Sequence, residues 1–232
     1  MQDAHDTAQV AAGNNADLCA AIMTAHGLRF ERDASAFLCL DAPPPYYPNM
    51  ITLDPAIPLA YQRKAMEVAS VKDSFSSLDG AALGLQLLFE ASWIWSEPKA
   101  HTMPAGWHRI STTAELSAWH SAWRGDGAAS TPVIFPPACL NNPDLAFLAR
   151  ASGTRIQAGC IANLSEDAVG LSNVFSGAPD DGRLYPEALA AASTVGQGRP
   201  VAGYECGEDL DAARVAGFRD IGHLRVWIRP PA

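Results

Sequence analysis

The sequence lacks three features that would assign the protein to a specialised class. No stretch approaches the ~20 consecutive apolar residues that cross a bilayer, and the polar start MQDAHDTAQV shows no basic-then-apolar signal pattern. The five cysteines form no CxxC pair, and the six histidines show no metal-ligand spacing with one another or with cysteine. We therefore expect a cytoplasmic protein with reduced thiols, without a bound metal and without a membrane partner.

Positive charge is also scarce. The chain has 16 Lys and Arg residues against 25 Asp and Glu residues, which gives a formal net charge of −9 at pH 7. Nucleic acids and anionic membrane surfaces usually bind to basic patches, so this balance argues against both as partners. The composition favours small molecules, or a second copy of the chain in a homodimer.

Apolar residues are plentiful, since 48% of the 232 residues are hydrophobic, enough for the core of one large or two small domains. Residues 1–16 are small and polar without apolar periodicity, which predicts a flexible arm. Residues 17–104 are expected to form an N-terminal α/β region packed on the core. There a helix begins at Asp17 and stops at Gly27, and the runs FLCLD and NMITLD are typical of strands.

Two segments of this region leave alternatives open. The stiff, extended loop APPPYYPN carries Tyr46 and Tyr47, which either line a pocket or cap the edge of a core. The run ALGLQLLFEASWIW is either a helix or a strand, because its periodicity does not separate the two. AYQRKAMEVASV predicts a second helix. The segment SEPKAHTMPAG, with two prolines and a glycine, marks the expected boundary with residues 105–232.

Residues 105–232 have a clearer order of elements. WHRI predicts a strand, and TTAELSAWHSAW an amphipathic helix in which Thr112 and Glu115 have capping-box spacing. LAFLAR, RIQAGCIA and AVGLSNVF predict an antiparallel meander, because short polar turns separate them. LYPEALAAAST, RPVAGYE, EDLDAARVAGF and HLRVWI then predict helix, strand, helix and strand. This order predicts an α+β fold.

The order and local text of this half resemble the GCN5-related N-acetyltransferase (GNAT) superfamily. AGCIANLSEDAVGLSNVF is similar to the family's third and fourth strands. GRPVAGYECGEDLDAARVAGFRDIGHLRVW is similar to its fifth strand, fourth helix and following strand, with the habitual GF at Gly217 and Phe218. The resemblance implies a mixed, mostly antiparallel sheet flanked by helices, here with an N-terminal α/β extension. It also implies an acyltransferase that moves an acetyl group from acetyl-CoA to an amine of a small molecule or peptide.

The resemblance further implies a cofactor site between the splayed fourth and fifth strands. The backbone that would pair with the pantetheine arm belongs to Ser172, Asn173, Val174 and Phe175. The loop that follows would hold the pyrophosphate with backbone N–H groups at a helix N-terminus, through Gly177, Gly182 and Arg183.

Two departures from the family favour an alternative, a catalytically inactive GNAT-fold binding or regulatory protein. The loop SGAPDDGR is atypical, because its glycines are far apart, Pro179 lacks an N–H, and Asp180 and Asp181 add negative charge. Many family members place a tyrosine acid five residues before the phenylalanine of the GF pair, where this chain has Ala213. A third possibility, an unrelated α+β hydrolase, lacks a GxSxG or Cys/His arrangement.

The chemistry therefore needs other residues near the fifth strand. Glu205 is the candidate base for deprotonating an amine, although an exposed or capping glutamate is the alternative. Tyr204 and Cys206 are the nearest candidate acids in sequence. Asn163, Ser172 and Asn173 are either hydrogen-bonding groups of the cleft or ordinary strand residues.

Overall fold

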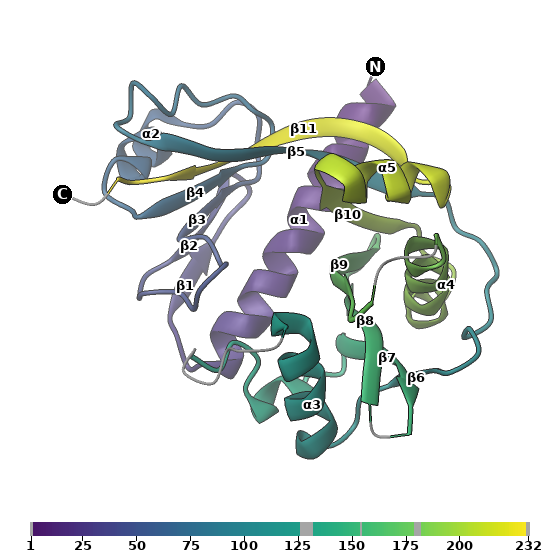
Figure 1. Cartoon of the computed structure of the whole chain (residues 1–232). Coiled ribbons are helices and arrows are strands. Elements are labelled where there is room, and N and C mark those ends of the chain that lie inside the picture. The colour runs from purple at the N-terminus through teal and green to yellow at the C-terminus, as the bar shows by residue number, and fades with distance from the viewer. Residues whose placement is uncertain (1, 126–131, 154, 179–181, 231–232) are drawn as a thin grey trace.

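The computed structural model describes residues 2–125, 132–153, 155–178 and 182–230, without the side chains of residues 2–5. These residues form one 11-stranded sheet of order β1-β2-β3-β4-β11-β5-β10-β9-β8-β7-β6 (Figure 1). The strands are β1 (Phe30–Arg32), β2 (Ala36–Cys39), β3 (Met50–Thr52), β4 (Ser70–Asp73), β5 (Gln86–Ser96), β6 (Trp107–Arg109), β7 (Leu145–Ser152), β8 (Arg155–Leu164), β9 (Val169–Ser176), β10 (Val201–Glu205) and β11 (Arg219–Ile228). The helices are α1 (Gln2–Ala25), α2 (Leu59–Ala65), α3 (Thr113–Arg124), the 3-10 helix η1 (Pro137–Asn141), α4 (Leu184–Gly196) and α5 (Gly207–Val215).

The sheet is mixed and mostly antiparallel. Among the described residues, β3 pairs with β4 and β9 pairs with β10 in parallel, and every other neighbouring pair is antiparallel. This confirms the predicted α+β class. No helix in this part of the chain combines the length and the apolar character needed to span a membrane.

The ambiguous run before residue 96 is a strand at the centre of the sheet. β5 lies between β10 and β11 and pairs antiparallel with both. Trp93 and Trp95 belong to the core cluster under α1, whereas Ile94 belongs to the cluster under α4, as the alternation of a strand requires. Residues 91–96 are buried on both faces, whereas residues 86–90 are mostly exposed although they include Leu87 and Leu88, so the apolar residues show no two-residue period. The N-terminal and C-terminal halves therefore share one sheet.

The expectation of a flexible arm over residues 1–16 was wrong, because residues 2–16 belong to the 24-residue helix α1. The helix lies across the sheet (Figure 1), and up to residue 16 its buried face is built mainly from Ala8, Ala11, Ala12 and Ala16. Alanine has the highest helix propensity but a weak hydrophobic signal. Its small side chain allows close packing, since a Cβ built on Gly222 would lie 3.5 Å from the Ala8 Cβ.

The helices after β9 cover the opposite face. Val201 of β10 packs in one cluster with Ala188 and Leu189 of α4, whereas its neighbour Ala202 packs in the cluster under α1. Because successive strand residues point to opposite faces, α1 and α4 lie on different sides of the sheet. Any site where β9 and β10 separate is therefore bounded by α1 on one side and by α4 and α5 on the other.

Local signals in the second half were accurate. The capping box of α3 is present, with the Glu115 N–H donating to Thr112 Oγ1 at 3.2 Å. Gly217 follows α5 with φ 101°, in the region that favours glycine. The expected helix over residues 60–71 is shorter, because Ser70 already belongs to strand β4.

Candidate active site at the separation of β9 and β10

Strands β9 and β10 run side by side for only two residue pairs. The register joins Val201 to Val169 and Ala202 to Gly170, and no further pair is formed between these strands within the described residues. β10 continues to Glu205 while paired with β5 alone. A β-bulge in β9 accompanies the separation, since the register with β8 shifts by one residue and Asn173 takes φ 51°. Bulges bend a strand and change where its side chains point.

A cavity of about 190 Å³ opens at this separation. Five of the residues predicted from the sequence line it, namely Ser172, Asn173, Val174, Tyr204 and Glu205. The remaining walls come from α1, from residues 46–48 and from Lys72 of β4. The aromatic loop therefore does line a pocket, and α1 closes its outer side.

A second cavity, of about 530 Å³, lies where β9 ends and α4 begins. Gly177 and Arg183 line it, together with Arg150 and Arg155 from the β7–β8 hairpin. Glu187 is the acidic residue of the lining, and its carboxylate contacts Arg150 Nη1 at 2.5 Å and Arg183 Nη1 at 4.0 Å. Among the described residues of the lining, three guanidinium groups stand against one carboxylate, which is a local excess of positive charge in an acidic protein.

Two other predicted cofactor residues lie outside both cavity linings. Phe175 packs edge-on against Trp119 of α3, with ring centroids 5.1 Å apart. Gly182 precedes α4 with φ 81°. Pro179, Asp180 and Asp181, on which the atypical loop depends, lie outside the described residues.

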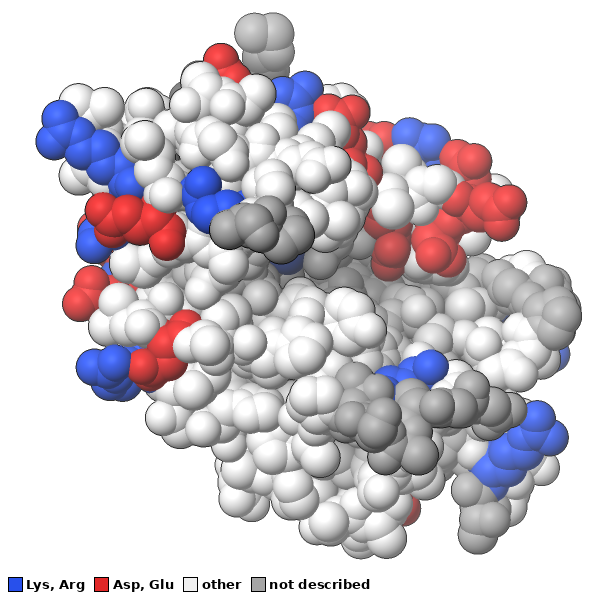
Figure 2. Space-filling view, turned by 60° about the vertical axis from the view of Figure 1, so that its left-hand side comes forward, with Lys and Arg blue, Asp and Glu red and all other residues white. Residues whose placement is uncertain are grey.

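Glu205 is half-buried at the end of β10, on the side of α4 and α5. Burial raises the pKa of its carboxyl to about 7, against the opposing effect of a hydrogen bond from Tyr185 of α4, and the charge of Asp209 raises it further. The same contacts, together with burial, raise the pKa of the Tyr185 phenol well above its usual range. Figure 2 shows acidic side chains gathered at the upper right, at the height of α5, whose surface also carries Glu208 and Asp211. A carboxyl with a pKa of about 7 can exchange protons near neutral pH.

Tyr204 faces the opposite way, toward α1. Its ring meets Trp93 edge-on with centroids 5.5 Å apart, and Lys72 Nζ lies 4.2 Å from its ring centroid. Cys206 is exposed at the N-cap of α5, and Ala213 is completely buried on the inner face of the same helix. Tyr204 and Glu205 thus approach one cavity from the two faces of β10.

Two polar residues of this site, Lys72 and Tyr185, were not predicted from the sequence, whereas for Tyr47 a pocket was one of two alternatives left open. A lysine within the short strand SVKD is a detectable signal, because a charged side chain flanked by buried positions needs a partner. Tyr185 was read only as part of a helix. Its contact with Glu205 depends on the packing of α4 against β10, which no local pattern encodes.

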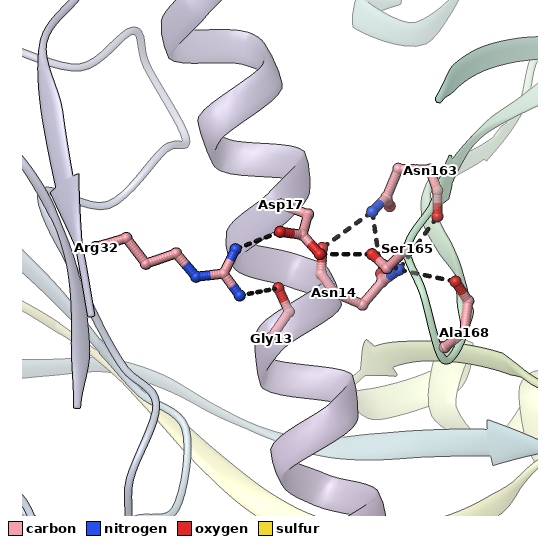
Figure 3. A network of polar contacts seen from close by, with 7 residues as sticks. All are labelled: Gly13, Asn14, Asp17, Arg32, Asn163, Ser165 and Ala168. Carbon is pink, nitrogen blue, oxygen red and sulfur yellow. Dashed lines mark hydrogen bonds and ion pairs between the residues drawn. The ribbon is translucent and has the colours of Figure 1, made fainter. Parts of the chain in front are cut away.

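Asn163 lies away from the cavity, in a polar network that joins α1 to β8 and the following turn (Figure 3). Asn14 Nδ2 donates to the Asn163 carbonyl at 3.2 Å and to Ser165 Oγ at 2.8 Å, and Asn163 Nδ2 donates back to the Asn14 carbonyl at 2.9 Å. Ser165 Oγ donates to Asp17, which also pairs with Arg32. A Cβ on Gly170 would come within 2.1 Å of Asn14 Oδ1, so glycine is required there.

Comparison with known proteins supports the fold and goes no further. No family model and no curated protein matches the sequence. A GCN5-related N-acetyltransferase from Kribbella flavida has a TM-score of 0.57 and 14% identity over 94% of this chain and 96% of that chain. A protein of the GNAT family from Novosphingobium aromaticivorans has a TM-score of 0.55 and 10% identity over 87% and 92% of the two chains. A functionally unknown conserved protein from Staphylococcus epidermidis has a TM-score of 0.59 and 9% identity over 87% and 93%.

The chain therefore has a GNAT-like fold, and the likeness extends over most of its length. The resemblance noted for residues 105–232 is thus part of a larger similarity that includes the N-terminal half. At such low identity the similarity concerns the fold, and the activity has to be argued from the site itself.

Proposed function

We propose that this protein is an N-acetyltransferase that moves an acetyl group from acetyl-CoA to an amine of a small molecule or peptide. The observation that carries the proposal is the separation of β9 from β10 beyond Gly170 and Ala202. Tyr204 and Glu205 both line the cavity at this point. The Kribbella flavida N-acetyltransferase, which is similar to this chain in fold, is consistent with this assignment.

The described residues fit acetyl-CoA in two places. Residues 172–174 line the cavity beyond the last pair with β10, so that edge of β9 can pair with the amide groups of a pantetheine arm. Gly203 lets the two strands stay close just past their last pair, because a Cβ there would lie 2.6 Å from the Leu171 carbonyl oxygen. The cavity lined by Arg150, Arg155 and Arg183 offers guanidinium groups, which suit phosphates.

The thioester of acetyl-CoA supplies an electrophilic carbonyl carbon. Glu205, as a carboxylate, accepts the proton of the acceptor ammonium so that the nitrogen lone pair can attack. A base with a pKa of about 7 suits this step, because it is largely ionised just above neutral pH and still basic. Tyr204, in the same cavity, is placed to donate a proton to the departing thiolate.

A second candidate function is a binding or regulatory module without catalysis. The observation that favours it is Ala213, which is completely buried at the position where many GNAT enzymes place a tyrosine acid. Tyr204 has to replace that group for the chain to be an enzyme, and it approaches from the other face of β10.

Calorimetric titration of the full chain with acetyl-CoA and with CoA tests the proposal, followed by an assay of thiol release with a mixture of amines. We expect a dissociation constant below roughly 100 μM, or about −5.5 kcal/mol, and thiol release that depends on the amine. Binding without thiol release would favour the binding module. No heat at millimolar ligand would reject both the cofactor and the acetyltransferase assignment.

A further inference from the structure

The cavity between β9 and β10 contains a buried positive charge without an acidic partner. Lys72 is 4% exposed and is one of the residues that line the cavity. Its contacts within the described residues are a hydrogen bond to Asn15 Oδ1 at 2.8 Å and the face of the Tyr204 ring, with Nζ 4.2 Å from the centroid. No Asp or Glu forms an ion pair with it in this part of the chain. Buried charges are normally paired, because removing them from water is costly.

A second hydrogen-bonding group of the same cavity is unsatisfied. The hydroxyl of Tyr47 is buried and has no hydrogen-bond partner in the described residues, although Tyr47 lines the cavity. Lys72 and Tyr47 line the same cavity, and Cys19 of α1 belongs to that lining as well. An ammonium and a phenol hydroxyl are both donors, and a carboxylate oxygen accepts from both.

Glu205 enters the cavity from the other face of β10. The ring of Tyr204, over which Lys72 Nζ lies, points toward α1. Glu205 contacts Tyr185 on the side of α4. The lining is therefore positive on the side of α1 and carries a carboxyl on the side of α4. The volume of about 190 Å³ equals roughly six waters at ~30 Å³ each, which is room for a small organic molecule.

We propose that the acetyl acceptor is a small amine that also carries a carboxylate, as an amino acid does, and that its carboxylate binds Lys72 and the Tyr47 hydroxyl. The assignment rests on the proposed acetyltransferase function. The amine then lies toward Glu205, which takes its proton. The nitrogen lone pair forms the N–C bond, and the C–S bond of the thioester breaks. The second proton that the nitrogen loses on becoming an amide passes by way of Tyr204 to the thiolate, which gives CoA.

The test compares three amino acids with their own amides, which differ only in replacing the carboxylate by a neutral group. L-alanine, L-leucine and L-phenylalanine are titrated into the full chain against L-alaninamide, L-leucinamide and L-phenylalaninamide, with and without CoA. The pH is about 6.5, where both kinds of α-amino group are protonated. We expect at least one acid to bind about tenfold or more tightly than its amide, as a hydrogen bond to a charged group requires.

Variants assign that preference to the donors. Lys72→Met keeps the apolar stem and should reduce the ratio of acid to amide affinity to about one. Tyr47→Phe removes only a hydroxyl and should reduce the ratio by roughly two- to tenfold. Lys64→Met, at an exposed lysine of α2 paired with Glu67, should leave the ratio unchanged. If Lys72→Met fails to fold, Tyr47→Phe decides.

Amides that bind as tightly as the acids, an unaltered ratio in the variants, or no binding in either condition would overturn the proposal. Thiol release from acetyl-CoA, measured on the same samples, reports the proposed function separately. A preference for acids without thiol release keeps the carboxylate site and rejects the acetyltransferase. Thiol release with equal use of acids and amides keeps the acetyltransferase and rejects the carboxylate site.

Discussion

Two polar clusters contact α1, and they differ in how completely their groups are paired. Asn14 belongs to the first, where its amide and that of Asn163 exchange hydrogen bonds and Ser165 accepts another (Figure 3). Its neighbour Asn15 belongs to the second, where it accepts from Lys72 beside the unpaired hydroxyl of Tyr47. Asn14 and Asn15 are adjacent on α1. The first belongs to a network in which the polar groups are hydrogen-bonded, and the second lines a cavity in which the Tyr47 hydroxyl is not.

The difference separates structural polar groups from binding groups. Buried groups that hold a fold together are almost always hydrogen-bonded, because each unmet donor or acceptor costs about 1–3 kcal/mol. The Asn14 network meets that requirement and fixes α1 to β8 and the following turn. The donors of Lys72 and Tyr47, and the raised pKa of Glu205, leave interactions for a ligand to complete.

The largest expected effect comes from changing Glu205 in the unsatisfied cavity. Glu205→Gln should lower the rate of acetyl transfer by about 10²–10⁴-fold, the usual contribution of a general base. In the wild type the rate should rise with pH until about 7, because the base must be ionised, and the variant should lack that rise. Glu208→Gln, at an exposed position of α5, is the matched control. A full rate in Glu205→Gln would mean that another group takes the proton.

Ionisation of Glu205 should affect stability and rate in opposite directions. It raises the rate of acetyl transfer but lowers the free energy of unfolding. The folded pKa of about 7 lies above the unfolded value of 4.5, so the folded state binds more protons between these pH values. The unfolding free energy contributed by this carboxyl therefore falls as pH rises through that window. Glu205→Gln does not titrate, and its melting temperature above pH 7 should equal or exceed that of the wild type. A marked loss of stability there would indicate that the carboxylate is structural.

The next effect tests the satisfied network. Asn163→Ala removes the two hydrogen bonds that Asn163 Nδ2 donates to the Asn14 carbonyl and to Asn14 Oδ1, and should destabilise the protein by about 2–3 kcal/mol. For a chain of 232 residues this corresponds to a decrease in melting temperature of roughly 4–12 °C. Carboxylate binding should persist in the folded fraction, because neither Asn14 nor Asn163 lines that cavity. An unchanged melting temperature would remove the contrast between the two clusters.

Elements with strong local signals were predictable from sequence. The capping box at Thr112 and Glu115, the meander β7–β9 and Gly217 after α5 all depend on residues close in the chain. The alanine-rich start of α1 was missed because its helical face carries little hydrophobic contrast. β5 remained ambiguous because its second half is buried on both faces while its first half carries exposed leucines, so no two-residue period appears.

The site divides in the same way. Tyr204, Glu205 and residues 172–174 could be found because they are adjacent to elements with family-like order, and they do line one cavity. Lys72 and Tyr185 could not be assigned, since β4 reaches Tyr204 only across β11 and β5, and α4 reaches Glu205 only through packing. Contacts between distant segments are set by the sheet order, which a single sequence does not reveal.

A substitution at Gly217 tests a position outside both polar clusters. Gly217 has φ 101° and a Cβ there would meet nothing closer than Lys99 Nζ at 3.7 Å, so the strain of Gly217→Val comes from the backbone. We expect a loss of about 1–2 kcal/mol and a decrease in melting temperature of roughly 2–8 °C. Ligand affinities measured well below that temperature should match the wild type. Gly217→Ala, with a smaller side chain, should cost less.

The smallest expected effect is at the arginine-lined cavity, which extends the comparison from the acceptor to the phosphates. Arg183 precedes α4 and contacts Glu187 at 4.0 Å, with a side chain 65% exposed, so water screens much of its charge. Arg183→Ala should therefore weaken acetyl-CoA binding by only ~0.5–1.5 kcal/mol, or roughly two- to tenfold. Calorimetry at low and high salt measures it, and the difference should shrink as salt rises.

Arg63→Ala, at an exposed arginine of α2, is the matched control and should not change the affinity. It also separates a local effect from a general loss of positive charge, which would act on both variants alike through the field of the whole protein. Equal affinity in the wild type and Arg183→Ala would show that the phosphates do not lie beside α4. The phosphates of the cofactor would then have to lie elsewhere while its pantetheine arm pairs with β9. The carboxylate site at Lys72 could still hold its ligand.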